Sequence, residues 1–155
     1  MLNELDQELK ELSKNTGSVC VGFNLRKASR LVMRLYDQAL KPIHLNGTQF
    51  SLLLTVAAHR NATIGELAKP LCMERSTLSR NLIVLQKKNW VQLETGEDRR
   101  QQRISITLKG VATLREALPL WQKVQDDLTN ELGEEKTSNL LTYLGCLVKN
   151  NSMKV

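Results

Sequence analysis

Residues 62–90 contain two helix patterns that lie too close together to form one long helix. Thr63 and Glu66 have the spacing of a capping box, and apolar residues follow at helical intervals. Pro70 limits this first helix to about two turns, and the next helix cannot begin much before Glu74. Two helices joined by a turn of three or four residues form a helix-turn-helix.

The second of these helices has two different faces. Leu78, Leu82 and Leu85 recur at helical spacing and are expected to be buried. The opposite direction is shared by Ser76, Arg80, Ile83, Val84 and Lys87, with Thr77 and Ser79 beside them. Small hydroxyls and an arginine suit the edges of bases in a DNA major groove. The alternative is that this face only contacts solvent, but that interpretation does not explain why the aliphatic residues Ile83 and Val84 lie on it.

A strand hairpin is predicted directly after this helix. The runs "WVQLE" and "RISIT" favour β-structure and are joined by "TGEDRRQQ". A helix-turn-helix followed by such a hairpin is a winged helix. Arg99 and Arg100 at the hairpin tip can enter a narrow minor groove. Asp98 can hold a neighbouring guanidinium group in place by a bidentate hydrogen bond. An ordinary charged turn would be the better interpretation if the hairpin stood alone.

The remaining chain is predicted to be helical, which gives a mainly α fold with a small antiparallel β wing. Helices are expected over residues 2–12, 19–41, 48–59, 110–131 and 134–149, the first ended by "NTGS". The leucines of the first and last helices need an apolar cover. A second copy of the chain would supply it, and packing within one chain is the alternative.

Composition limits the classes of function. The 155 residues fit one domain, and a net charge of +6 favours an anionic partner such as nucleic acid or a membrane surface. No apolar run is long enough to span a membrane, and the N-terminus lacks the pattern of a signal peptide. The three cysteines are few and far apart, which suits reduced thiols. We therefore expect a cytoplasmic protein without a membrane partner.

Enzymatic motifs are missing from the sequence. His44 and His59 lie fifteen residues apart, and neither a C-x-x-C, an H-E-x-x-H nor a Gly-rich phosphate loop occurs. Each histidine is interpreted as a surface or packing residue. The sequence thus predicts no catalytic residues, no metal site and no cofactor. A metal site assembled from distant residues stays the alternative.

Residues 63–110 resemble the multiple-antibiotic-resistance regulator (MarR) family of bacterial winged-helix transcription factors. The likeness rests on "IGELAKPLCMERSTLSRNLIVLQKKNWV", the Asp98-x-Arg100 pair and "ISITLKG", and extends over nearly the whole chain. It implies that Arg100 enters the minor groove with Asp98 as its support. Glu74 departs from the capping aspartate common in the family, and glutamate caps poorly, which leaves Ser76 as an alternative helix start.

The resemblance also implies that different parts of the single domain 1–155 bind DNA and form the dimer. Residues 48–109 would form the DNA-binding lobe, and residues 1–47 and 110–155 the dimerisation helices. The predicted DNA-binding residues are Arg75, Ser76, Thr77, Ser79, Arg80, Lys87, Asp98, Arg99, Arg100 and Arg103.

An effector site is expected near the junction of the helices and the DNA-binding lobe, as in relatives of the family. The residues assigned to it are Cys20, Asn24, Tyr36, His59 and Trp121. Some relatives instead sense peroxide through a cysteine near the start of the helix 19–41. Cys20 lies in that neighbourhood, and a small packing role is its alternative.

Two functions from different classes remain. The first is a homodimeric regulator of transcription, a repressor as the family resemblance implies, that binds a pseudo-palindromic operator in double-stranded DNA and is released by a small molecule or by oxidation. The second is a winged-helix scaffold for protein contacts or non-specific nucleic-acid binding. A cluster of basic residues on the helix-turn-helix and the wing favours the first, and its members are Arg75, Arg80, Lys87, Lys88, Arg99, Arg100 and Arg103.

Overall fold

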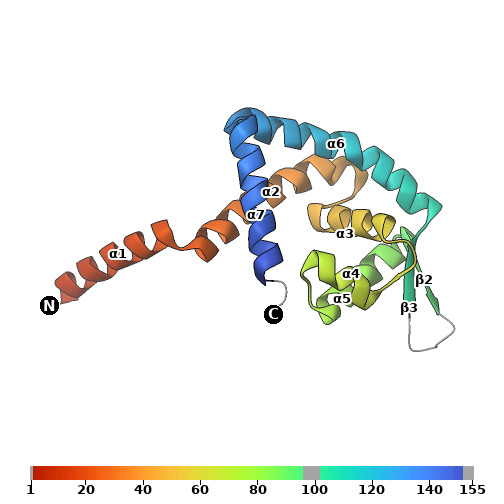
Figure 1. Cartoon of the computed structure of the whole chain (residues 1–155), viewed down its shortest axis with the longest axis horizontal. Coiled ribbons are helices and arrows are strands. Elements are labelled where there is room, and N and C mark those ends of the chain that lie inside the picture. Colours follow the sequence, from red (N-terminus) through yellow and green to blue (C-terminus); the bar gives the residue numbers. More distant parts are fainter. Residues whose placement is uncertain (1, 96–101, 152–155) are drawn as a thin grey trace. The chain divides into compact units, whose positions relative to one another are not determined.

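The computed structural model describes residues 2–95 and 102–151, with side chains for residues 5–94 and 102–150. The chain divides into two compact units, residues 1–35 and 36–155. Helices dominate its described part, and a small antiparallel sheet completes the fold (Figure 1). No helix in this part is long and apolar enough to cross a membrane.

The first unit contains α1 (Leu2–Val19) and most of α2 (Val21–Leu40). The expectation that "NTGS" ends the first helix is wrong, because α1 continues through these residues to Val19. The carboxamide of Asn24 caps the end of α1, since its Nδ2 donates to the carbonyl oxygens of Gly17 at 3.0 Å and Cys20 at 2.9 Å. This cap comes from the following helix, so a local pattern could not reveal it.

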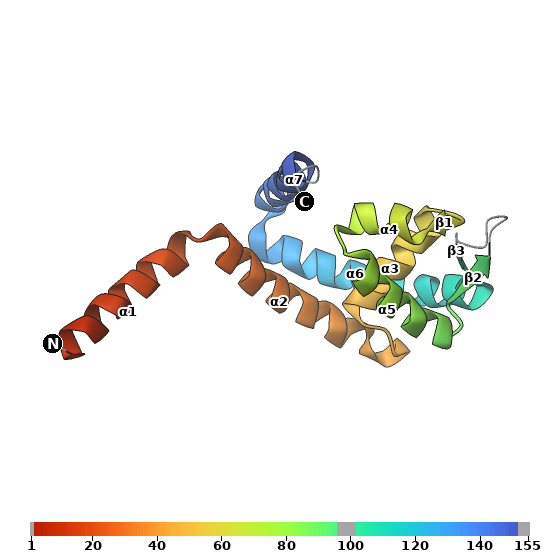
Figure 2. The same cartoon turned by 90° about the horizontal axis from the view of Figure 1, so that it is seen from below.

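The second unit holds the predicted helix-turn-helix and wing. After the end of α2 its elements are η1 (Lys41–Ile43), α3 (Gly47–Ala58), β1 (Ala62–Thr63), α4 (Ile64–Leu71), α5 (Arg75–Lys87), β2 (Val91–Thr95), β3 (Gln102–Ile106), α6 (Leu108–Leu132) and α7 (Glu134–Asn151). The helices and the two long strands agree with the expected ranges within about two residues. α3, α4 and α5 lie side by side in both views (Figures 1 and 2).

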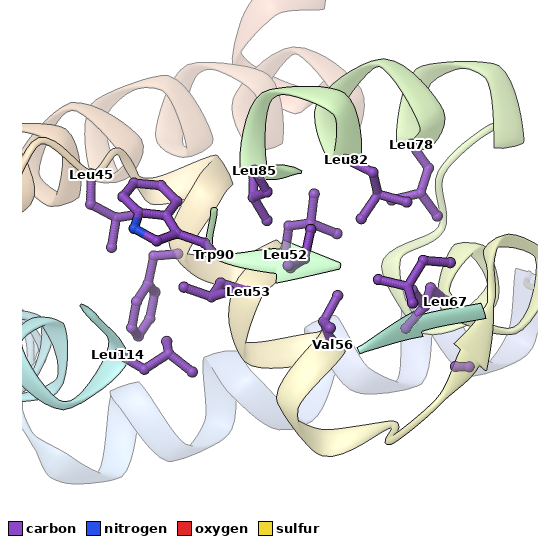
Figure 3. Packing of buried hydrophobic residues seen from close by; sticks show 14 of the residues in the cluster. Leu45, Leu52, Leu53, Val56, Leu67, Leu78, Leu82, Leu85, Trp90 and Leu114 are labelled. Carbon is purple, nitrogen blue, oxygen red and sulfur yellow. The ribbon is translucent and has the colours of Figure 1, made fainter. Parts of the chain in front are cut away.

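The core of this unit is built around α3. Figure 3 shows the buried leucines of α5, which are Leu78, Leu82 and Leu85, pointing toward α3. The α3 residues that receive them are Leu52, Leu53 and Val56, each at most 2% exposed. Burying these three leucines stabilises the fold by several kcal/mol, because each buried leucine side chain contributes about 1.5–3 kcal/mol. The core therefore fixes which face of α5 remains outside.

The sheet has the order β1-β3-β2, with both pairs antiparallel. Ile104 at the centre of β3 lies opposite Ala62 on one side and Leu93 on the other, and is fully buried. β1 was not among the predicted elements, because two residues are too short for any periodic pattern.

The wing is joined to α6 by a tight junction. Thr107 is the N-cap of α6: its Oγ1 accepts a hydrogen bond from the Gly110 amide at 3.0 Å and donates to the Asn89 carbonyl at 2.7 Å. A Cβ atom on Gly110 would lie 2.7 Å from Cγ1 of Ile106 and closer still to the carbonyl oxygen of Trp90. Only glycine therefore lets the first turn of α6 approach the end of the helix-turn-helix.

Candidate nucleic-acid interface

α5 leaves one face uncovered. Ser76, Thr77 and Arg80 are exposed on its N-terminal half, and Ser79 is half-buried. Further along the same side, Ile83 and Val84 are 48% and 40% exposed. The buried leucines hold the opposite side against α3, so this face is presented as a rigid surface.

The arginine of this face is held by its own helix. Arg80 Nε donates to the carbonyl oxygen of Ser76, one turn earlier, at 3.3 Å. That bond uses Nε and keeps the side chain along α5. The two terminal nitrogens of a guanidinium are the pair that can donate to O6 and N7 of guanine.

The start of α5 differs from one expectation. The helix begins at Arg75 with Glu74 as its N-cap, so the alternative start at Ser76 is wrong. Glu74 makes no side-chain capping hydrogen bond, as expected for glutamate. The Arg75 guanidinium lies against the first turn of α4, where a Cβ on Gly65 would be 3.2 Å from its Nη2 atom. Arg75 thus connects the two helices of the helix-turn-helix.

The tip of the wing lies outside the described residues. Asp98, Arg99 and Arg100 belong to the segment 96–101, and their roles in minor-groove binding stay predictions. The strands that carry this segment are described, and their register places Glu94 opposite Arg103. The segment thus connects two strands that are paired along their length.

Arg103 has a structural role in the sheet. Its Nη1 donates to the carbonyl oxygen of Asn61 at 2.9 Å, which ties β3 to the turn before β1. Hydrogen bonds from the Thr63 amide and hydroxyl lower the pKa of the nearby Glu66 carboxyl, and the charge of Arg103 lowers it further by a smaller amount. The part that Arg103 plays at DNA stays a prediction.

The lowered pKa of Glu66 makes the stability of this corner depend on pH. A carboxyl whose folded pKa is depressed stabilises the fold above its unfolded pKa, and that contribution is lost as the pH falls through the folded pKa. We expect Glu66→Gln, which keeps an acceptor for the Thr63 amide, to lower the thermal midpoint at neutral pH. The difference from wild type should vanish in acid.

Thermal unfolding from about pH 7 down to about pH 3 measures this effect. Glu116→Gln, on an exposed glutamate of α6, controls for the loss of one negative charge. A constant gap between wild type and Glu66→Gln across the whole range would contradict the assignment.

Two neighbouring lysines at the end of α5 have different surroundings. Lys87 is exposed on the face described above. Lys88 is half-buried, donates to the carbonyl oxygen of His44 at 2.6 Å and places its ammonium 4.3 Å from the centre of the Trp90 ring. The sequence pattern grouped both with the basic surface, but Lys88 instead joins α5 to the turn after η1.

The residues assigned to an effector site fall in both units of the chain. Cys20 and Asn24 belong to the first, where Cys20 is exposed between α1 and α2 and Asn24 is used as a helix cap. In the second unit, His59 is an exposed C-cap of α3, with its Nδ1 3.1 Å from the carbonyl oxygen of Thr55. These roles are local, and sensing by these three residues stays a prediction.

Tyr36 and Trp121 lie on two helices that pack on the core. The Tyr36 hydroxyl accepts a hydrogen bond from Gln125, one turn after Trp121 on α6. Partial burial raises the pKa of Tyr36, and the bond to Gln125 opposes that shift. Trp121 stacks on Phe50 with ring centres 6.2 Å apart. In the sequence Gln125 interrupts the apolar spacing of this helix, and that interruption is the signal that could have revealed a polar partner.

No group of three or more histidine, cysteine or acidic side chains that could hold a metal occurs within residues 5–94 and 102–150.

Comparison with known proteins identifies the family. The MarR family model matches residues 45–101, from just after η1 to the segment between β2 and β3. Over 117 residues the chain is 30% identical to the multiple antibiotic resistance protein MarR of Escherichia coli, covering 75% of this chain and 79% of that protein. The chain belongs to the MarR family. The resemblance noted in the sequence is thereby confirmed.

Solved structures agree with this membership. The M. tuberculosis regulator MosR in complex with DNA is 35% identical, with a TM-score of 0.79 over 86% of this chain and 97% of that one. The repressor CouR bound to a DNA duplex is 28% identical, with a TM-score of 0.78 over 85% and 94%. The expected mainly helical fold with an antiparallel wing is confirmed, and this MarR-family chain is a winged-helix regulator of transcription.

Proposed function

We propose that this protein is a homodimeric repressor that binds a specific operator in double-stranded DNA, and that it is a regulator rather than an enzyme. The observation that carries the proposal is the outer face of α5, with exposed hydroxyls and Arg80 on a helix locked by three buried leucines. The predicted DNA-binding residues of the wing would contact the neighbouring minor groove. MosR and CouR, both solved with DNA, support this assignment.

Dimerisation is supported by apolar side chains on the last two helices. Leu132 of α6 and Leu140, Leu141 and Val148 of α7 are between 42% and 62% exposed. Isolated exposed leucines are normal on a soluble protein, whereas several on adjoining helices indicate an interaction surface. A second copy of the chain is the partner that two-fold symmetric DNA recognition requires.

Release from DNA by a small molecule or by oxidation completes the proposal. CouR has been solved with DNA and also with p-coumaroyl-CoA, so one member of the same fold takes both kinds of ligand. The five residues predicted for sensing, including Cys20, keep that role here as a proposal. The alternative, a winged-helix scaffold for protein contacts or non-specific nucleic-acid binding, lacks a comparable precedent among these relatives.

Selection of binding sites from a random duplex library tests the proposed function. A two-fold dimer should enrich a pseudo-palindrome whose half-sites are centred about one helical turn, ~10 base pairs, apart. Light scattering of the complex should give two chains for each duplex. Recovery of no common sequence, or full affinity of one chain for a single half-site, would refute the proposal.

A further inference from the structure

The exposed face of α5 carries two aliphatic side chains in a polar setting. Ile83 and Val84 are 48% and 40% exposed, and they follow Arg80 by three and four residues. Residues at these spacings are neighbours on a helix surface. The aliphatic pair therefore continues, by one turn, the face assigned to DNA.

A major groove offers few apolar partners. The C5-methyl group of thymine is the apolar feature among the base edges there, since the other groups are hydrogen-bond donors and acceptors. Contacts with phosphate and sugar would stabilise the complex little when an exposed isoleucine or valine loses its contact with water. The chemistry of the pair thus matches thymine better than any other part of the duplex.

Resting on the proposed function, we propose that Ile83 and Val84 contact thymine methyl groups and so determine part of the operator sequence. Three or four residues advance about 4.5–6 Å along a helix axis, at ~1.5 Å for each residue. Base pairs are stacked ~3.4 Å apart. The thymines should therefore lie one or two base pairs from the guanine contacted by Arg80.

A docked protein is the competing partner for this pair. Its surroundings oppose that choice, because Ser76, Arg80 and Lys87 are exposed on the same face and divide the apolar area. Protein interaction sites usually present larger continuous apolar patches. The basic and hydroxyl side chains instead complement a polyanion that carries isolated methyl groups.

Replacing thymine by deoxyuridine removes only the methyl group and so isolates this contact. The probe is the duplex selected from the random library, in a thymine form and in a form with deoxyuridine beside the Arg80-contacted guanine. We expect full-length wild type to bind the deoxyuridine form about fourfold more weakly for each methyl lost from the contact. Ile83→Ala and Val84→Ala should each lose part of this preference, and the double variant Ile83→Ala/Val84→Ala should bind both forms alike. Leu54→Ala, at a 43% exposed leucine of α3, is the matched control and should keep the preference.

The possible outcomes separate this proposal from the function on which it rests. Equal binding of both duplexes by wild type would overturn the methyl contact while leaving operator binding intact. A preference for thymine that survives undiminished in the double variant would overturn the choice of residues. Failure to select any sequence would overturn the proposed function as well. Thermal unfolding of each variant verifies that affinity was compared between folded proteins.

Discussion

The substitution Gly110→Ala is expected to lower the free energy of unfolding by about 3 kcal/mol or more, because the added methyl group meets backbone that cannot move aside. The Cβ atom would lie against the carbonyl oxygen of Trp90, within the junction of wing and α6. That carbonyl accepts the Thr107 amide at 3.0 Å, so displacing it also breaks a hydrogen bond. Urea unfolding at one fixed protein concentration measures the loss.

Gly22→Ala provides the control for this substitution. Gly22 lies in the first turn of α2, and a Cβ there would meet nothing within 4 Å. Alanine has the higher helix propensity, so this variant should be as stable as wild type or slightly more stable. Similar urea midpoints for Gly110→Ala and wild type would show that the junction can open, contrary to the close approach described here.

Local sequence patterns were sufficient to predict most of the helix-turn-helix and its strands. The capping box formed by Thr63 and Glu66 occurs in the structure as predicted, with both of its hydrogen bonds present. The leucines of α5 are buried as their spacing indicated. These features succeeded because each depends on residues within one or two helical turns of one another.

The features that escaped prediction depend on distant residues. α1 passes through "NTGS" because Asn24 of the next helix caps its end. Lys88 was grouped with the basic surface, but its ammonium donates to the carbonyl oxygen of His44, which lies forty-four residues earlier in the chain. A periodic pattern contains no information on such pairs, and it cannot detect a strand of two residues such as β1.

The roles of two arginines of the candidate site could not be predicted from the sequence, for a physical reason. Arg75 and Arg103 were assigned to DNA because they are basic and belong to the helix-turn-helix and the wing. In the structure the first lies against Gly65 and the second donates to the Asn61 carbonyl. Charge alone does not distinguish an arginine that binds phosphate from one that fixes neighbouring elements, since both use the same guanidinium donors.

Arg80→Ala is expected to weaken operator binding by about 1 to 3 kcal/mol for each half-site and to relax the preference at one base pair. Its side chain is exposed on α5 and is held along the helix by the bond to Ser76, so removing it leaves the buried leucines in place. Binding titrations on the selected operator and on duplexes altered at single positions measure both effects. Arg80→Lys keeps the charge but loses the paired donors, and should lose nearly as much specificity.

Lys87 provides the contrasting case on the same helix. It is exposed one turn beyond Ile83 and Val84, where a lysine can meet phosphate. Lys87→Ala should weaken all sequences alike and should lower the slope of log affinity against log salt concentration by about one unit for each half-site. Arg80→Ala should instead weaken the operator more than random DNA. Equal losses from both substitutions on specific and random duplexes would refute the division of roles, because a base contact and a phosphate contact cannot share that signature.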